Sequence, residues 1–234
     1  MEIKRFFGSK YGDKIVLSDR EYYHCVKVTR HKAGYSLICC IGDGKDYYCT
    51  IDKIEPDAVV CSIERVVTNN AETKAPFVLC QALCKEFDFV VQKAVELGVT
   101  EIVPYFSERT NVKKFSLDRL ESIVLDAAKQ CGRAVLPIVN DLVCYEEALS
   151  YASKFENKIF CYENERVNSL KDAIKSTSST VVFIGSEGGF SEKEVDLAKQ
   201  NCFEVVSLGR RILKVETASI AALVLALDAM GDIC

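Results

Sequence analysis

The sequence has no long hydrophobic segment. Its longest apolar run near the C-terminus, residues 220–227, stops at Asp228, and a run of that length is too short to span a bilayer. No apolar stretch follows the charged start Met-Glu-Ile-Lys-Arg, so we expect no signal peptide. These absences predict a cytoplasmic protein with no membrane partner.

The sequence also lacks a CxxC motif and has only two histidines, His24 and His31, so we expect no metal site. The twelve cysteines among 234 residues are about 5% of the chain, short of the roughly 8–10% of a disulfide scaffold. Many of them, such as Cys39, Cys61 and Cys161, lie in apolar runs, where free cysteine behaves as a small hydrophobe. This usage is typical of a reducing compartment.

The net charge is small. Thirty basic residues against thirty-four acidic ones give −4, so bulk charge does not indicate a nucleic-acid-binding protein, although a local basic patch is enough to bind phosphate. Basic residues outnumber acidic ones in residues 1–34 and again in residues 109–133. We expect phosphate contacts in these two stretches.

Residues 1–70 have the pattern of short strands joined by turns. The segment Gly-Asp-Gly-Lys at 42–45 predicts a hairpin, because glycine supplies the positive φ that such turns need. One helix is expected at 19–29, and the polar segment 68–76 ends in proline and predicts a linker. We expect a small β-rich domain over 1–70, with strands at 14–17, 36–41, 47–54 and 58–66.

Strand-like and helix-like segments alternate after residue 76. This order predicts a mainly parallel sheet covered on both faces, with ligands bound beyond the carboxyl ends of its strands. Ser191 and Glu194 form a capping box that fixes the start of one helix. Strands are expected at 77–82, 101–105, 135–139, 158–162, 180–185 and 203–208, and helices at 87–97, 116–131, 145–155, 170–175, 191–200 and 215–230.

Two loops have the composition of binding sites. The first, Ile-Gly-Ser-Glu-Gly-Gly-Phe at 184–190, follows a strand and precedes the capped helix; its glycines let the backbone approach a ligand, although a plain tight turn would have the same composition. It is neither a Walker loop nor a GxGxxG fingerprint. The second, residues 208–218, combines Arg210, Arg211 and Lys214 with the apolar Ile212 and Leu213, which suits either a flat ligand beside cations or a solvated loop whose apolar residues plug the core.

At these loops the sequence resembles the RsmE family of bacterial methyltransferases, of the SPOUT class. Residues 185–189 resemble the family's Gly-Pro-Glu-Gly-Gly, and residues 208–218 its Leu-Gly-Pro-Arg-Ile-Leu-Arg-Thr-Glu-Thr-Ala. Ser186 and Arg210 replace prolines, which predicts looser loops, and Lys214 replaces an arginine. The loop near Lys85 is shorter than in the family. Further matches lie at 5–7, 24–30, 92–102, 107–109 and 128–133, so the resemblance covers nearly the whole chain.

The resemblance implies methylation of N3 of a uridine in the decoding region of 16S ribosomal RNA, in the small subunit, with S-adenosylmethionine (SAM) as cofactor. It implies an α/β fold: a SPOUT-type, mainly parallel sheet at 76–234 with a C-terminal trefoil knot, preceded by a PUA-like β-barrel RNA-binding domain at 1–70. It also implies a homodimer. The implied SAM-binding residues are Tyr162, Ile184, Gly185, Glu187, Gly188, Gly189, Leu208, Gly209, Ile212 and Leu213.

Methylation of N3 requires the imide proton to leave as the methyl group arrives. Cations beside the uracil carbonyls would stabilise the developing charge, and Arg211 and Lys214 are candidates. Glu216 or Glu187 could accept the proton, although Glu187 could instead bond loop amides, Glu216 suits the first turn of a helix, and solvent could take the proton. The expected RNA contacts are Arg5, His24, Arg30, Lys85, Arg109, Lys113, Arg133 and Arg210.

Other functions stay open. The chain could be a SPOUT methyltransferase that acts on a different RNA, or an RNA-binding ribosome assembly factor without turnover. A nucleotide-binding dehydrogenase is disfavoured, because no glycine-rich fingerprint with a downstream acidic residue is present.

Overall fold

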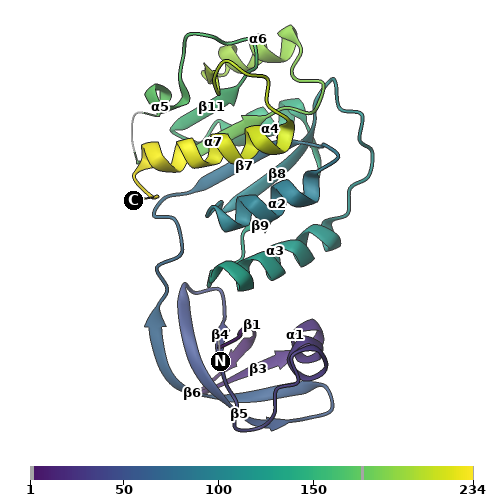
Figure 1. The fold of residues 1–234 in the computed structure, drawn as a ribbon, viewed down its shortest axis with the longest axis vertical. Coiled ribbons are helices and arrows are strands. Elements are labelled where there is room, and N and C mark those ends of the chain that lie inside the picture. The colour runs from purple at the N-terminus through teal and green to yellow at the C-terminus, as the bar shows by residue number, and fades with distance from the viewer. Residues whose placement is uncertain (1–2, 175–176, 234) are drawn as a thin grey trace. The chain divides into compact units, whose positions relative to one another are not determined.

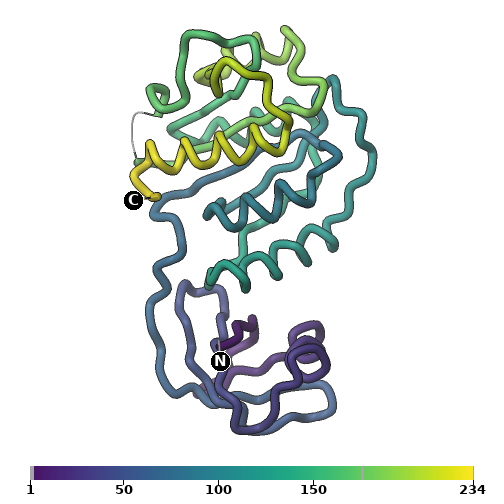
Figure 2. Tube along the Cα trace, in the orientation of Figure 1, coloured from purple at the N-terminus to yellow at the C-terminus, as the bar shows by residue number. Residues whose placement is uncertain are grey.

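The computed structural model describes residues 3–174 and 177–233, and Figures 1 and 2 follow the chain from end to end. The chain divides into two compact units. The first consists of residues 1–72 and 128–136, and the second of residues 73–127 and 137–234.

The first unit is a β-sheet in the order β1-β4-β5-β6-β3-β2. Strands β1 and β4 are parallel, and the other neighbours are antiparallel. The predicted hairpin at 42–45 is confirmed, because it joins β4 to β5 with positive φ at Gly42 and Gly44. The strands are β1 (Arg5–Phe7), β2 (Ser9–Tyr11), β3 (Lys14–Ser18), β4 (Ser36–Cys40), β5 (Lys45–Ile54) and β6 (Ala58–Thr68).

Alternating residues of these strands build an apolar core. Phe6, Leu37 and Ile15 are fully buried in it. The cysteines of this unit contribute small apolar volumes, since Cys39 and Cys61 are fully buried among the same residues. Their burial confirms the expectation that these cysteines act as small hydrophobes.

The single helix predicted at 19–29 is wrong in one respect. The structure has a short α-helix, α1 (Asp19–Tyr23), that continues as a π-helix, η1 (His24–Val28). The Thr29 amide donates to the His24 carbonyl five residues earlier, which is the hydrogen bond that defines a π-helix. The predicted range therefore holds two helical geometries.

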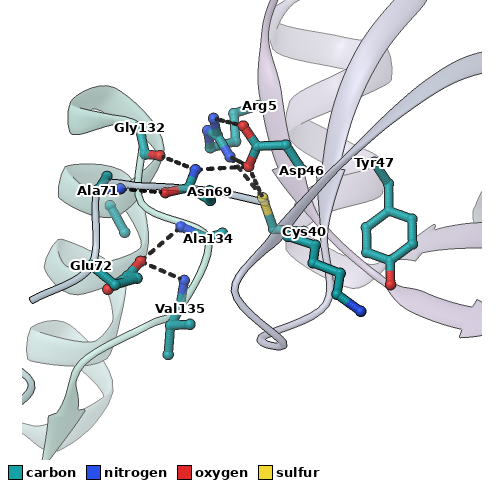
Figure 3. Close-up of polar contacts among 12 residues, drawn as sticks. Arg5, Cys40, Asp46, Tyr47, Asn69, Ala71, Glu72, Gly132, Ala134 and Val135 are labelled. Carbon is teal, nitrogen blue, oxygen red and sulfur yellow. Dashed lines mark hydrogen bonds and ion pairs between the residues drawn. The ribbon is translucent and has the colours of Figure 1, made fainter. Parts of the chain in front are cut away.

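Residues 128–136 are joined to the rest of this unit by Asn69, which the Asp46 carboxylate holds, and by the carboxylate of Glu72 (Figure 3). Asp46 accepts hydrogen bonds from Arg5 at 2.5 and 2.8 Å and from the Asn69 side chain at 2.8 Å. The same Asn69 amide also donates to the Gly132 carbonyl at 2.9 Å.

Glu72 is the second of these carboxylates. One of its oxygens accepts the amides of Ala134 and Val135, each at 3.0 Å, and the other accepts Arg133 at 2.7 Å. This pairing corrects the strand predicted at 135–139. The Val135 amide is taken by Glu72, and only β9 (Ile138–Val139) pairs with the sheet of the second unit.

The second unit is a sheet in the order β10-β8-β7-β12-β11-β13, with β9 beside β8. Every pairing is parallel, which confirms the predicted parallel α/β class. Strands β7 and β12 lie at its centre, and all their residues are buried, as expected for strands covered on both faces. The strands are β7 (Phe77–Ala82), β8 (Glu101–Phe106), β10 (Val143–Cys144), β11 (Asn157–Cys161), β12 (Thr180–Ile184) and β13 (Glu204–Val206).

Helices cover both faces of this sheet. Helices α2 and α7 lie together on one face (Figure 1), and α4 and α6 pack on the other face against an aromatic core that includes Tyr105, Phe160 and Phe183. Helix α7 coincides with its predicted range. Helix α4 and strand β13 are shorter than predicted, and the expected helix at 170–175 reaches residue 175, outside the described residues. The helices are α2 (Phe87–Glu96), α3 (Leu117–Cys131), α4 (Tyr145–Ala152), α5 (Leu170–Ala173), α6 (Glu192–Gln200) and α7 (Val215–Met230).

We predict that Asp46→Asn destabilises the chain at neutral pH. Burial alone would raise the pKa of Asp46, but hydrogen bonds from Arg5 and Asn69 hold the pKa below its ordinary value of 3.8. A lowered carboxyl pKa contributes stability above the unfolded-state value, and that stability is lost on acidification. The substitution leaves the mostly buried Arg5 without its anion, which costs about 3 kcal/mol at pH 7.

Urea unfolding at pH 7 and at pH 3 measures this effect. The difference between wild type and Asp46→Asn is expected to shrink between pH 7 and pH 3, because the stability that a lowered carboxyl pKa contributes is lost as the pH falls below the unfolded-state value of 3.8. Glu55→Gln is the control, since Glu55 forms an exposed ion pair with Lys53 and its loss costs about 0.5 kcal/mol or less. Equal effects of the two substitutions would contradict the prediction.

Candidate active site

A cleft of about 910 Å³ lies in the second unit. Its walls follow the carboxyl ends of four neighbouring strands, β7, β12, β11 and β13. Ligands of parallel sheets bind at this edge, and the volume falls in the range of small-molecule and cofactor sites. The cleft is therefore the candidate site that the alternating pattern predicts.

The first wall is the glycine-rich loop between β12 and α6. The loop ends at Ser191, whose side chain accepts from the Glu194 amide, while the Glu194 carboxylate accepts from the Ser191 amide at 2.8 Å. This confirms the predicted capping box. Gly188 packs closely, because a Cβ atom there would lie 2.8 Å from Cβ of Arg109. A side chain at 188 would therefore push two loops apart.

The segment Ser107–Arg109 fastens this loop from behind. Arg109 donates from Nη1 to the Gly188 carbonyl at 3.1 Å. The Ser186 hydroxyl donates to the Arg109 carbonyl at 3.2 Å, and Ser186 is buried. Where the family has proline, this chain holds the loop with a side-chain hydrogen bond that proline cannot make.

Glu187 connects the glycine loop to the segment after β7. Its Oε1 accepts the Lys85 amide at 2.8 Å, so the carboxylate bonds a neighbouring loop amide. This is one of the two roles that the sequence left open for Glu187, and it places Lys85 at the cleft.

A buried amide joins three parts of the site. The Gln81 side chain, at the end of β7, is fully buried. Its Nε2 donates to the Gly185 carbonyl at 3.2 Å, and its Oε1 accepts the Ser219 hydroxyl of α7 at 2.7 Å. Buried polar groups need such partners, so Gln81 fixes the glycine loop and α7 relative to β7.

The second wall is the segment between β13 and α7. Gly209 has φ +113°, a conformation that side chains rarely adopt, and its amide donates to the Ser207 hydroxyl at 3.2 Å. Ile212 is 83% exposed. It is therefore not packed in the core, which was one of the two interpretations of this loop from the sequence. Lys214 is the N-cap residue of α7, and its Nζ lies 4.0 Å from Oε1 of Glu216 in the first turn.

The structure brings every predicted cofactor and catalytic residue to this one cleft. The lining includes Tyr162, Ile184, Gly185, Glu187, Gly188, Gly189, Leu208, Gly209, Ile212 and Leu213, together with Arg211, Lys214 and Glu216. Their individual roles stay predictions.

Several residues that line the cleft were not predicted from the sequence. Cys161 and Glu163 flank Tyr162 at the end of β11, and Phe89 reaches the cleft from α2. The end of a predicted strand could have indicated Cys161 and Glu163, because ligands of parallel sheets bind beyond strand ends. Phe89 gave no such signal, since it lies in a helix whose apolar spacing indicated only a core face. Burial raises the pKa of the Cys161 thiol well above its ordinary value, so this residue is a neutral thiol in the cleft rather than a thiolate.

The residues predicted to contact RNA are divided between the units. Lys85, Arg109, Lys113 and Arg210 belong to the second unit and are exposed, and only Lys85 of these four lines the cleft.

Arg5, His24, Arg30 and Arg133 belong to the first unit. Arg30 is exposed, but Arg5 and Arg133 are engaged by Asp46 and Glu72. His24 lies 3.2 Å from Nζ of Lys129. The side chains of Arg5 and Arg133 thus hold the first unit together, and a contact of theirs with RNA stays a prediction.

Two features are absent from the described ranges, 3–174 and 177–233. No cluster of three or more His, Cys, Asp or Glu side chains in these ranges is arranged to hold a metal ion. None of their helices combines the length and the apolar character needed to cross a membrane.

Comparison with known proteins agrees with this architecture. Residues 71–227 match the model of an RNA methyltransferase domain family. The chain is 32% identical to a ribosomal RNA small subunit methyltransferase E of Mesomycoplasma hyopneumoniae, over 92% of this chain and 95% of that protein. It is 28% identical to the protein of the same name from Bacillus subtilis, over 88% and 87% of the two chains.

A solved structure covers almost the entire chain. The ribosomal RNA small subunit methyltransferase E of Neisseria gonorrhoeae, crystallised with S-adenosyl methionine, matches with a TM-score of 0.87 and 32% identity, over 97% of this chain and 98% of that one. These matches confirm the resemblance in the sequence, and the chain belongs to the RsmE family of RNA methyltransferases.

Proposed function

We propose that this chain uses SAM to methylate N3 of a uridine in the decoding region of 16S ribosomal RNA, in the small subunit. The observation that carries the proposal is the cleft at the carboxyl ends of β7, β12, β11 and β13, with both family loops on its walls. The activity and the cofactor follow from the family, and the site provides the residues for them.

The cleft fits SAM. Its volume of about 910 Å³ suits a ligand of this size, and at Gly209 a Cβ atom would meet no other atom within 4 Å, so the backbone there is open to a ligand. SAM carries a net positive charge, and the carboxylates of Glu86, Glu163 and Glu216 also line the cleft. The ten predicted residues, from Tyr162 to Leu213, would hold the cofactor.

Bound SAM supplies a methyl group on a sulfonium, and the protein must prepare the uracil that receives it. As N3 of uracil loses its proton, negative charge spreads to the carbonyl oxygens. Arg211 and Lys214 line the cleft and are exposed, so their charges can stabilise that anion. Holding the base in line with the methyl group supplies a large part of the acceleration.

Glu216 is the proposed proton acceptor within the cleft. It is 24% exposed and lies beside Lys214, so it can reach solvent while remaining near a cation. Glu187 already accepts the Lys85 amide, which makes it the weaker candidate. Solvent remains the alternative acceptor.

The finer architecture is also proposed from the family. The chain at 1–70 would be a PUA-like RNA-binding domain, and 76–234 a SPOUT domain whose C-terminal part forms a trefoil knot around the cofactor. A homodimer is supported by α7, where Val224 and Leu225 are 36% and 38% exposed on a helix whose other face is buried. Ribosomal RNA as substrate places the enzyme in the cytoplasm.

Phosphate contacts are proposed for the exposed cations first. Arg30, Lys85, Arg109, Lys113 and Arg210 are free to meet a polyanion, apart from the bond of Arg109 to Gly188. Such contacts give affinity that falls steeply with salt. His24, Arg5 and Arg133 are the secondary candidates, because they also hold the first unit together.

Methyl transfer from labelled SAM to small subunits that lack the modification tests the proposal. After digestion to nucleosides, the label is expected in 3-methyluridine. Label in another nucleoside would support a methyltransferase with a different RNA target. Absence of SAM binding would support the non-catalytic assembly factor and contradict the proposed activity, whereas SAM binding without transfer would point to a different RNA partner or assembly stage.

Arg211→Ala is predicted to lower kcat by about a hundredfold, the usual cost of removing a group that stabilises a developing anion. The dissociation constant for SAM, measured by calorimetry, is expected to change little. Arg210→Ala provides the contrast, because Arg210 is exposed and is not part of the cleft lining. This substitution should raise KM for subunits in a salt-dependent manner. An equal loss of SAM affinity and of kcat in Arg211→Ala would assign Arg211 to the cofactor instead.

A further inference from the structure

An aromatic ring that no role yet explains faces the cleft. Phe89 belongs to α2, whose buried face consists of Phe87, Val90, Val91, Ala94 and Val95. Phe89 lies off that face, is 40% exposed and lines the cleft. Single exposed apolar residues are ordinary, but this one lines a ligand-sized cleft.

Phe89 differs from the other rings there. Among the aromatic residues of the described chain that line the cleft, Phe190 is 2% exposed and Tyr162 is half-buried. Phe89 is therefore the ring with a large open surface. Lys93 lies 5.5 Å from its centroid, and Lys85 and Lys214 line the same cleft.

Methylation at N3 makes a specific demand on the site. N3 lies on the Watson–Crick edge of uracil, so it is covered whenever the base is paired. Enzymes that act on such atoms extrude the base or use a single strand, and they receive it by stacking and by hydrogen bonds to its edge. RNA-binding proteins stack splayed bases on aromatic side chains.

We propose that Phe89 is the platform on which the target uracil stacks. This inference rests on the proposed function and adds the residue that selects a flat, unpaired base. The ring supplies a sequence-tolerant π face, and Lys85, which lines the same cleft, offers charge for a flanking phosphate. Arg211 and Lys214 then meet the carbonyl oxygens of a base that is already oriented.

Variants of Phe89 test this role in the subunit methylation assay. Phe89→Ala is expected to lower kcat/KM for subunits by about tenfold, the usual worth of one base–aromatic stack, without changing the dissociation constant for SAM. Phe89→Trp should retain wild-type activity. Phe89→Leu should lose activity as Phe89→Ala does, since leucine is apolar but has no π face. Phe106→Ala is the matched control, because Phe106 is 41% exposed and is not part of the cleft lining.

Three results would overturn the inference. Wild-type activity in Phe89→Leu would make the ring a mere apolar cover. Weaker binding of SAM in Phe89→Ala would assign the ring to the cofactor. Equal losses in Phe89→Ala and Phe106→Ala would indicate a general effect on the fold.

A second measurement does not depend on turnover. The chain has no tryptophan, so Phe89→Trp creates a single fluorescent reporter at the cleft. With SAM present, oligouridylate is expected to quench its fluorescence, and an abasic oligoribonucleotide of equal length and charge is expected not to. Equal quenching by both, or none by either, would contradict stacking even if the methylation assay itself failed and removed the proposed function.

Discussion

The buried side chain of Gln81 is the constraint on which the site depends. It lies at the carboxyl end of the central strand β7, where it has no access to water. Its Nε2 donates to the carbonyls of Ala82 and Gly185, and its Oε1 accepts the Ser219 hydroxyl. Loss of one of these partners would leave a buried polar group unsatisfied, at a cost of about 1–3 kcal/mol. One side chain therefore ties both the glycine loop and α7, which line the cleft, to β7.

Further polar contacts fix the same loop. Arg109 and Ser186 hold it from the Ser107–Arg109 segment, and Glu187 holds it to the Lys85 amide. Gly188 and Gly189 pack closely against Arg109 and Glu163, while the cations Arg211 and Lys214 come from the neighbouring loop. The cleft is thus prepared before a ligand arrives, as electrostatic catalysis requires. Phe89 adds an open ring to a site otherwise built from loops.

Local signals predicted much of this architecture. The range of α7 and the capping box at Ser191 depend on neighbouring residues, and both were predicted correctly. Both glycine loops were predicted at strand ends, because strand and turn composition is read locally. The Gln81–Ser219 bond joins residues 138 positions apart, and no local pattern reveals such a partner. For the same reason, Arg5 and Arg133 looked like free cations in the sequence, although Asp46 and Glu72 pair with them in the fold. The strand predicted at 135–139 was shortened because Glu72 takes the Val135 amide.

Amide hydrogen exchange of the full chain, with and without SAM, tests most directly whether this cleft is the cofactor site. SAM is expected to slow exchange in two segments distant in sequence, 185–189 and 207–213, and at the end of β11 near Tyr162. The sheet of residues 5–68 should exchange at an unchanged rate. Protection confined to other segments, or no protection at saturating SAM, would contradict the assignment of the cleft.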